Sequence, residues 1–453
     1  MLAVTAAATL GTWASAASSS NDPYFPEQWG LTRINAPSAW TRSTGVGVKI
    51  GVIDTGIDLT HEDLAAKVAA SVSCIGARDL SQACAGSAQD DQGHGTHVAG
   101  LAAAVTGNSK GVAGVAPDAK LVIVKALGAS GSGALNDVNA GIKWAVDNGA
   151  RVINLSLESD GHEVTIAPGQ SLTEGVDYAF KKNAIVVVAA GNATPSLFGS
   201  AGYANVNAVI VGATGRQDEV AWYSSSLAGA KWALVAPGGN ARGPDGRASC
   251  AGVLAADCVV STGWFSGKTN QYADDEGTSM ATPHVAGAIA LVMAQNPALS
   301  ASAAVDRVLA TVDRVPCGDG CRGRLNVAAA VGAPVSPTVT TTVPPPAGGP
   351  GPGPGPAPTA LPAPAVAGGA LPPVTAIPPG SVPTTVAAAP VALTPGAPLA
   401  AGPPRAPASG PLRPKRAAAH VPGAALAAAI AALVIVGGEA ALLARRPGGL
   451  GPR

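Results

Sequence analysis

Short apolar runs that alternate with helical patterns place the strongest constraint on how this chain can fold. The runs are rich in Val and Ile and lie at Val48–Ile53, Leu121–Val124, Val152–Leu155, Ile185–Ala189 and Val209–Val211. Helical patterns lie between several of them, as at Asn136–Asn148 and Thr173–Lys182. Buried strands that alternate with helices need crossover connections, which produce parallel pairing. The sequence therefore predicts an α/β fold with a mostly parallel central sheet and helices on both faces.

A change of composition near residue 333 restricts this fold to the first part of the chain. Residues 331–422 contain no Asp, no Glu and no aromatic residue, but many prolines. Because such a segment cannot bury a core, we expect residues 333–422 to form an extended, partly polyproline linker. Residues 18–332 are then the predicted globular domain.

Apolar segments near the two ends predict export and membrane anchoring. Residues 1–17 are apolar and end in small residues, which fits a secretory signal, although no Lys or Arg lies near Met1. Residues 423–444 are apolar except for Glu439 and long enough to cross a bilayer. Residues 445–453 would form a short basic cytoplasmic tail. We expect a single-pass protein of the cell membrane with its globular domain outside; the alternative is an alanine-rich helix in a disordered tail.

Charge and cysteine content narrow the possible partners. The 28 Lys and Arg residues balance 28 Asp and Glu residues, so nothing indicates nucleic-acid binding. The even number of cysteines, six, fits disulfides in an oxidising compartment. We expect the local pairs among the 15 possible pairings, namely Cys74–Cys84, Cys250–Cys258 and Cys317–Cys321. Zinc is the alternative, and the absence of a CxxC pair disfavours it.

Three short segments place polar side chains at the ends of strands or at the start of a helix. IDTG at 53–56 puts Asp54 at the end of a buried strand, and AAGN at 189–192 does the same for Asn192. Catalytic groups collect at such ends, although both residue types are also common in turns. GHGTHVAG at 93–100 puts His94 at a helix start. A metal pair of His94 and His97 is the alternative, but the small residues that follow favour a buried, hydrogen-bonded His97.

A fourth segment, EGTSMATPHVAG at 276–287, places Ser279 where a helix begins. Ser279 could be an ordinary helix cap or a nucleophile. Pro283 is expected in the first turn of that helix, where its missing N–H needs no partner. This segment alone does not decide between the two roles.

Taken together, in the order Asp, His, Asn, Ser, the four segments resemble the signature blocks of the subtilisin family of serine proteases. The resemblance covers about residues 21–330 and implies a subtilisin-like three-layer fold. It also implies an endopeptidase that hydrolyses peptide bonds through an acyl-enzyme intermediate. In this family Ser279 would be the nucleophile, His94 the general base and Asp54 the carboxylate that orients His94. Asn192 would donate to the oxyanion.

Two further stretches, NDPYFPEQWGLTRINAPSAW and AAAVTGNSKGVAGVAPDAKL, resemble thermitase-like members of the family. This likeness implies a structural calcium site. The oxygen ligands would come from the side chains of Asp22, Asp63 and Asn108 and from the carbonyls of Val105, Lys110 and Val112. An all-oxygen set of this size suits Ca²⁺. The alternative is that the two acids are ordinary surface residues and the loop closes without metal.

The family resemblance also implies that polypeptide substrates bind as an added strand. The pairing edges would be Leu127 to Gly133, including Gly131, and Ser156-Leu157-Glu158. Glu158 departs from the glycine that is usual there. It could favour basic substrate side chains, narrow the pocket or point to solvent. We expect a monomer.

Two other functions remain open at this stage. One is a dedicated processing protease of a secretion system, because the mycosins share the layout of signal, proline-rich linker and C-terminal membrane segment. The other is a catalytically silent scaffold that binds peptides in the same cleft. Digestion of a panel of unstructured proteins would distinguish a broad protease from a dedicated one.

Overall fold

The computed structural model describes residues 20–334, except 78, 81–82, 158–163, 166–170, 193–201, 204, 242–249, 251–256 and 266. The predicted signal segment (1–17), the membrane segment (423–444), the basic tail (445–453) and all but the first two residues of the linker (333–422) lie outside this range. Within it, no helix is both long enough and apolar enough to span a membrane.

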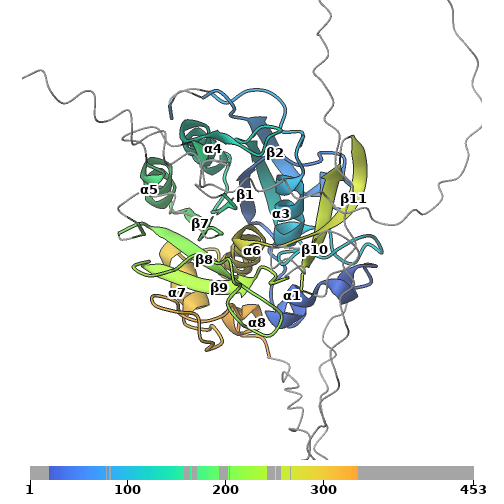
Figure 1. The fold of residues 1–453 in the computed structure, drawn as a ribbon, viewed down its shortest axis with the longest axis vertical. Coiled ribbons are helices and arrows are strands. Elements are labelled where there is room, and N and C mark those ends of the chain that lie inside the picture. The colour runs from blue at the N-terminus through green and yellow to red at the C-terminus, as the bar shows by residue number, and fades with distance from the viewer. Residues whose placement is uncertain are drawn as a thin grey trace, which may run out of the picture. The chain divides into compact units, whose positions relative to one another are not determined.

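Seven strands form a central sheet in the order β2-β3-β1-β5-β7-β8-β9, and every pair is parallel (Figure 1). The strands are β1 (Lys49–Asp54), β2 (Val68–Ser73), β3 (Lys120–Lys125), β5 (Val152–Leu155), β7 (Ile185–Ala189), β8 (Ala208–Thr214) and β9 (Trp232–Pro237). The five predicted strands supply the interior of the sheet. The two edge strands, β2 and β9, are additional.

The remaining elements surround this sheet. Two small sheets pair β10 (Val259–Phe265) antiparallel with β11 (Lys268–Asp275) and β4 (Gly133–Ala134) parallel with β6 (Val164–Thr165). The helices are α1 (Trp29–Arg33), α2 (Ala36–Ala39), α3 (His94–Ala103), α4 (Leu135–Asp147), α5 (Thr173–Lys181), α6 (Thr278–Gln295), α7 (Ala301–Leu309) and α8 (Val327–Ala330), with 3-10 turns η1 (Phe25–Glu27) and η2 (Ala65–Lys67). The two predicted helices correspond to α4 and α5 within one residue at each end.

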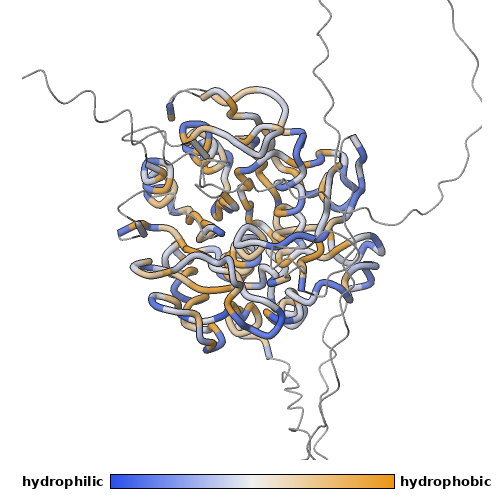
Figure 2. Tube along the Cα trace, in the orientation of Figure 1, coloured by the Kyte–Doolittle hydropathy of each residue, from blue (hydrophilic) through white to orange (hydrophobic). Residues whose placement is uncertain are grey.

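Both faces of the sheet are buried because successive side chains of each strand point to opposite sides. On β1, Val52 belongs to the core that includes α3 and α6, whereas Ile53 belongs to the core that includes α4 and α5. Figure 2 shows hydrophobic residues along the interior strands and hydrophilic residues mainly on outer segments. The prediction of a three-layer α/β fold with a parallel central sheet is therefore confirmed.

The strand order determines where functional side chains can meet. β1, β5 and β7 are neighbours, and because they are parallel their carboxyl ends lie at one edge of the sheet. Asp54 ends β1, Ser156 follows β5 and Asn192 lies just beyond β7. The sheet thus brings together three residues that are far apart in the sequence.

The three predicted disulfides are present, as Cys74–Cys84, Cys250–Cys258 and Cys317–Cys321. No cysteine is left free. The zinc alternative for these residues is thereby ruled out, since each sulfur is already bonded to another.

Candidate active site

Asp54 and His94 form a direct contact at the end of β1. The His94 Nδ1–H donates to the Asp54 carboxylate, with Nδ1 lying 2.9 Å from Oδ1 and 3.1 Å from Oδ2. The backbone N–H of Thr55 donates to Oδ1 at 2.7 Å. Asp54 is fully buried, whereas 16% of the His94 side chain is exposed. Because Nδ1 faces the carboxylate, Nε2 is the ring nitrogen on the opposite side.

The start of α3 is shaped so that His94 can reach Asp54. Gly93 precedes the helix at φ 108°, a conformation that favours glycine. A Cβ atom at Gly95 would lie 2.1 Å from the Gly56 carbonyl oxygen and 3.0 Å from Asp54 Cβ, so only glycine permits this approach. The buried Asp90 carboxylate accepts the N–H of Gly93 at 2.7 Å. A carboxylate at a helix N-terminus is also stabilised by the helix dipole.

Ser279 is the second residue of α6 and does not cap the helix. Gly277 occupies the cap position, and no side chain makes a capping bond there. The Ser279 hydroxyl instead donates to the Ser156 carbonyl oxygen at 3.2 Å. The simple-cap role for Ser279 is therefore wrong.

Pro283 lies in the second turn of α6 and not in the first turn, as the sequence had suggested. There its missing N–H would leave the Ser279 carbonyl without its usual intrahelical donor. The Ser156 hydroxyl fills this role and donates to the Ser279 carbonyl oxygen at 2.7 Å. Ser156 and Ser279 are thus linked by two reciprocal hydrogen bonds, which join the end of β5 to the start of α6.

Asn192 is held by a residue that the sequence patterns did not single out, Thr278. The Asn192 Oδ1 accepts the backbone N–H of Thr278 at 3.0 Å and its hydroxyl at 3.1 Å. These contacts define the orientation of the amide, so its Nδ2 is the donor end. A Cβ atom at Gly277 would lie 3.4 Å from Nδ2, which places the donor beside the residues that precede Ser279.

The predicted substrate edges are backbone features. The side chains of Leu127 and Leu157 are buried, so only their main chains could pair with a peptide. Between Leu127 and Gly133 the chain turns, with the Gly131 N–H donating to the Gly128 carbonyl at 2.9 Å. Gly131 has φ +78°, and a Cβ at Gly133 would lie 2.3 Å from the Ala126 carbonyl oxygen. Glu158 lies outside the described residues.

His97 is buried and engaged with backbone. Its Nε2 lies 3.2 Å from the Val259 carbonyl oxygen and 3.1 Å from that of Ala273, on β10 and β11. These contacts agree with the predicted buried, hydrogen-bonded histidine. Among the described residues, no group of three or more His, Cys, Asp or Glu side chains could hold a metal ion.

The six residues of the implied calcium site gather around one loop, residues 105–112. Asp22 accepts the N–H groups of Gly107 and Asn108 at 2.8 and 3.0 Å. Asp63 accepts the Asn108 side-chain amide at 2.8 Å and the Val112 N–H at 3.1 Å. Both carboxylates are buried, and burial raises the pKa of Asp63.

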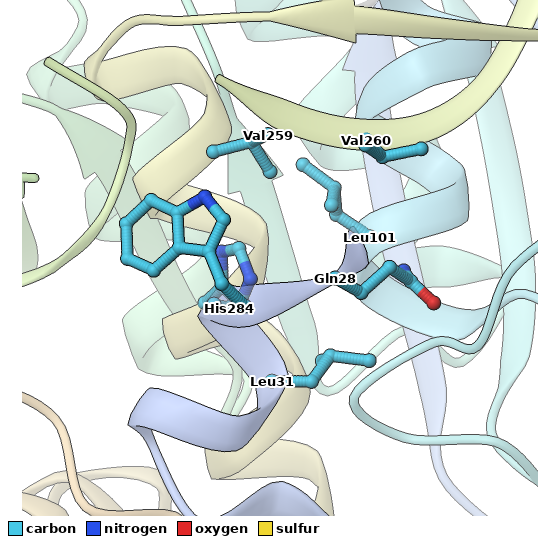
Figure 3. A pocket seen from close by; sticks show the side chains of 8 residues that line it. Gln28, Leu31, Leu101, Val259, Val260 and His284 are labelled. Carbon is cyan, nitrogen blue, oxygen red and sulfur yellow. The ribbon is translucent and has the colours of Figure 1, made fainter. Parts of the chain in front are cut away.

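Figure 3 shows a small pocket that is lined by other residues. Its lining is largely apolar and comprises Gln28, Trp29, Gly30, Leu31, Leu101, Val259, Val260 and His284. Burial lowers the pKa of His284 to about 4, and its Nδ1 lies 2.8 Å from the Met280 carbonyl oxygen. His284 is therefore neutral near pH 7, and none of the predicted site residues lines this pocket.

Comparisons with known proteins match most of the described chain. The model of the Subtilase family, Peptidase_S8, matches residues 45–332. Subtilisin Savinase from Lederbergia lenta is 43% identical over 274 residues, which is 60% of this chain and 86% of the relative. Thermitase from Thermoactinomyces vulgaris is 38% identical over 316 residues, 69% of this chain and 98% of the relative. A solved protease structure from Pseudoalteromonas arctica has a TM-score of 0.58 at 31% identity and covers 70% of this chain and 99% of its own.

Proposed function

Because the chain belongs to the subtilase family and is a subtilisin-like serine protease, we propose that it cleaves polypeptides through nucleophilic attack by Ser279. A serine hydroxyl is too weakly acidic to attack a peptide carbonyl unaided, so it needs an adjacent base. His94 is that base, and the observation that carries the proposal is its contact with the buried Asp54. The carboxylate keeps the proton on Nδ1, which leaves Nε2 to accept the proton of Ser279.

The reaction then proceeds in two halves. Ser279 Oγ bonds to the carbonyl carbon as its proton passes to His94, and His94 returns that proton to the leaving amine. Water attacks the resulting acyl-enzyme with His94 again acting as base, which regenerates Ser279. Because the Ser279 hydroxyl donates to Ser156 before substrate binds, it has to rotate toward His94 for the first step.

The test of this proposal is labelling with a fluorophosphonate probe, which reacts with activated serines. We expect one equivalent of probe on the intact protein and expect mass spectrometry to find it on Ser279. A folded sample that takes up no probe would leave the silent peptide-binding scaffold as the better explanation. Probe found on another residue would instead identify that residue as the nucleophile and overturn the role of Ser279.

Asn192 is proposed to donate through Nδ2 to the oxyanion of the tetrahedral intermediate, together with the Ser279 backbone N–H at the start of α6. We expect Asn192→Ala to lower kcat by ~10²–10³-fold, which is the effect known for loss of one such donor in a subtilisin. KM should change little, because the donor acts mainly in the transition state. Steady-state kinetics on a peptide substrate measure both values, and a rise in KM at constant kcat would contradict the role.

We also propose that Ca²⁺ binds at the 105–112 loop and has a structural role there. Asp22, Asp63 and Asn108 would hold it with side-chain oxygens, and Val105, Lys110 and Val112 with carbonyl oxygens. The fit is supported by two buried carboxylates that converge on one loop, one with a raised pKa that a bound cation would counter. The ion would cross-link the N-terminal segment to the loop that follows α3.

Removal of calcium is expected to lower the melting temperature. At a free calcium concentration about 100 times Kd, binding stabilises the folded state by ~2.7 kcal/mol. For a domain of this size that corresponds to a shift of roughly 4 °C. The shift is measured by comparing the melting temperature in excess chelator with the melting temperature after calcium is restored. Asp63→Asn should abolish the difference, and identical melting curves with and without calcium would refute the site.

The location of the enzyme is part of the same proposal. Residues 1–17 direct export, residues 333–422 act as a spacer and residues 423–444 anchor the chain, so the protease domain faces the outside. The support is the order of apolar and proline-rich segments in the sequence. Deletion of residues 423–453 should release the protease into the medium; retention of the shortened chain on the membrane would argue against the anchor.

A further inference from the structure

Lys125 is a buried lysine that lies one strand away from Asp54. It ends β3, and in the parallel pairing of β1 with β3 it is the register partner of Asp54. Only 8% of its side chain is exposed. Burial of an ammonium group is costly unless its charge and its three donors are satisfied. The contacts that satisfy Lys125 therefore indicate what it does.

Three acceptors from three different segments surround the ammonium group. The Lys125 Nζ donates to the Thr55 carbonyl oxygen at 2.8 Å, to the Leu127 carbonyl oxygen at 2.9 Å and to Asp91 Oδ1 at 2.6 Å. Thr55 follows Asp54, Leu127 begins one predicted substrate edge, and Asp91 lies in the segment that leads into His94. All three donors are thus used, each on a different part of the candidate active site.

The Thr55 peptide shows how this arrangement reaches the catalytic residues. Its N–H donates to the Asp54 carboxylate, and the Thr55 hydroxyl accepts the N–H of Gly95, next to His94. The Thr55 carbonyl, on the other side of the residue, is held by Lys125. Leu127 is tied to the same turn, because its N–H donates to the Asp54 carbonyl oxygen at 3.1 Å.

We propose that Lys125 is a positioning residue of this protease. Its ammonium group fixes the turn after Asp54, the start of the Leu127 edge and the segment before His94 relative to one another. Lys125 does not touch the reacting atoms; it acts through Asp54, His94 and the peptide-binding backbone. This inference rests on the catalytic roles proposed above.

The test replaces Lys125 with methionine, which keeps an unbranched chain of similar length but has no donor. Lys143→Met is the matched control, because Lys143 is a more exposed lysine on α4 that pairs with Asp147. The active fraction of each variant is counted by fluorophosphonate labelling. kcat and KM are then measured per active site for a long peptide, which reaches the Leu127 edge, and for a short ester, which does not. Melting curves report folding separately.

We expect Lys125→Met to lower kcat for both substrates, by ~10²-fold, the loss typical of small misplacements of catalytic groups. For the long peptide KM should also rise, since the Leu127 edge is no longer held. Lys143→Met should match the wild type in every measurement. A Lys125→Met protein that melts at a lower temperature but keeps the wild-type kcat per active site would overturn the proposal, because the lysine would then serve stability alone.

Failure of this inference can be distinguished from failure of the proposed function. If the catalytic roles are wrong, the wild-type protein itself will not be labelled at Ser279, and this result alone identifies a failure of the proposed function. If the roles are right and Lys125 is not a positioning residue, labelling and wild-type kinetics will be normal while the Lys125→Met kinetics stay unchanged.

Discussion

Replacement of Ser279 by alanine is expected to reduce kcat by roughly 10⁶-fold, the loss known for the equivalent change in a subtilisin. In the proposed mechanism the oxygen of this hydroxyl is the atom that bonds to substrate, so no neighbouring group could replace it without a new geometry. Fluorophosphonate labelling should disappear in parallel. Hydrolysis of a chromogenic peptide, followed over hours at high enzyme concentration, gives the residual rate.

The fold should tolerate this change. The substitution removes one hydrogen bond, from the Ser279 hydroxyl to the Ser156 carbonyl, worth about 1 kcal/mol. The reverse hydrogen bond, from the Ser156 hydroxyl to the Ser279 carbonyl, does not depend on the side chain of Ser279. Melting should therefore change little while activity is lost.

Ser300→Ala provides the matched control for Ser279→Ala. The Ser300 hydroxyl caps α7 by accepting the N–H of Ala303 at 3.1 Å. Its loss should cost ~1 kcal/mol of stability and leave kcat unchanged. A Ser279→Ala protein that still hydrolyses peptide at a substantial fraction of the wild-type rate would mean that another residue is the nucleophile.

The interior strands could be predicted from sequence because they are buried on both faces and read as continuous apolar runs. Edge strand β2 is different, since its first four residues alternate between half-buried and exposed positions and only Val72 is buried, which gives no such run. The β10–β11 hairpin contains many polar residues, and its place depends on contacts with α3 that are distant in sequence. One such contact joins the Thr262 hydroxyl to the Thr96 carbonyl. Local pattern cannot reveal pairings of this kind.

The candidate site also contains residues that a local motif reveals and residues whose role depends on contacts distant in the sequence. The sequence could single out four candidates, Asp54, His94, Asn192 and Ser279, because each lies in a short motif at a strand end or helix start. Thr278, which holds Asn192, lies inside one of those motifs but has no local sign of its role. Its partner is 86 positions away in the chain.

The burial of Lys125 could not be predicted from the sequence for a related reason. A lysine at the end of an apolar strand is ordinarily expected to reach solvent. Its burial becomes clear only when the Thr55 and Leu127 carbonyls and the Asp91 carboxylate are seen to converge on it. The sequence thus predicts the chemistry of the reacting groups better than it predicts the residues that hold them in place.

Replacement of Asp54 by asparagine is expected to have the second largest effect. We expect kcat to fall by ~10⁴-fold with little change in structure. The reason lies in how the side chain would be oriented. The Thr55 N–H, which donates to Oδ1 at 2.7 Å, should retain the oxygen of the new amide. The NH₂ group would then take the place of Oδ2, which lies 3.1 Å from His94 Nδ1.

The retained oxygen still lies 2.9 Å from Nδ1, but it is neutral and shared with the Thr55 N–H, while the NH₂ group donates to Nδ1 in the tautomer that carries the proton on Nε2. The amide therefore no longer fixes the proton on Nδ1, and the negative charge that stabilises the His94 imidazolium is lost, so His94 becomes a poor base although its position is kept. Steady-state kinetics and fluorophosphonate labelling rates should fall together, whereas melting should stay close to that of the wild type. Asp147→Asn, at a half-exposed acid paired with Lys143, controls for loss of a charge elsewhere. If Asp54→Asn remained as active as that control, the Asp54–His94 contact would not be what activates Ser279.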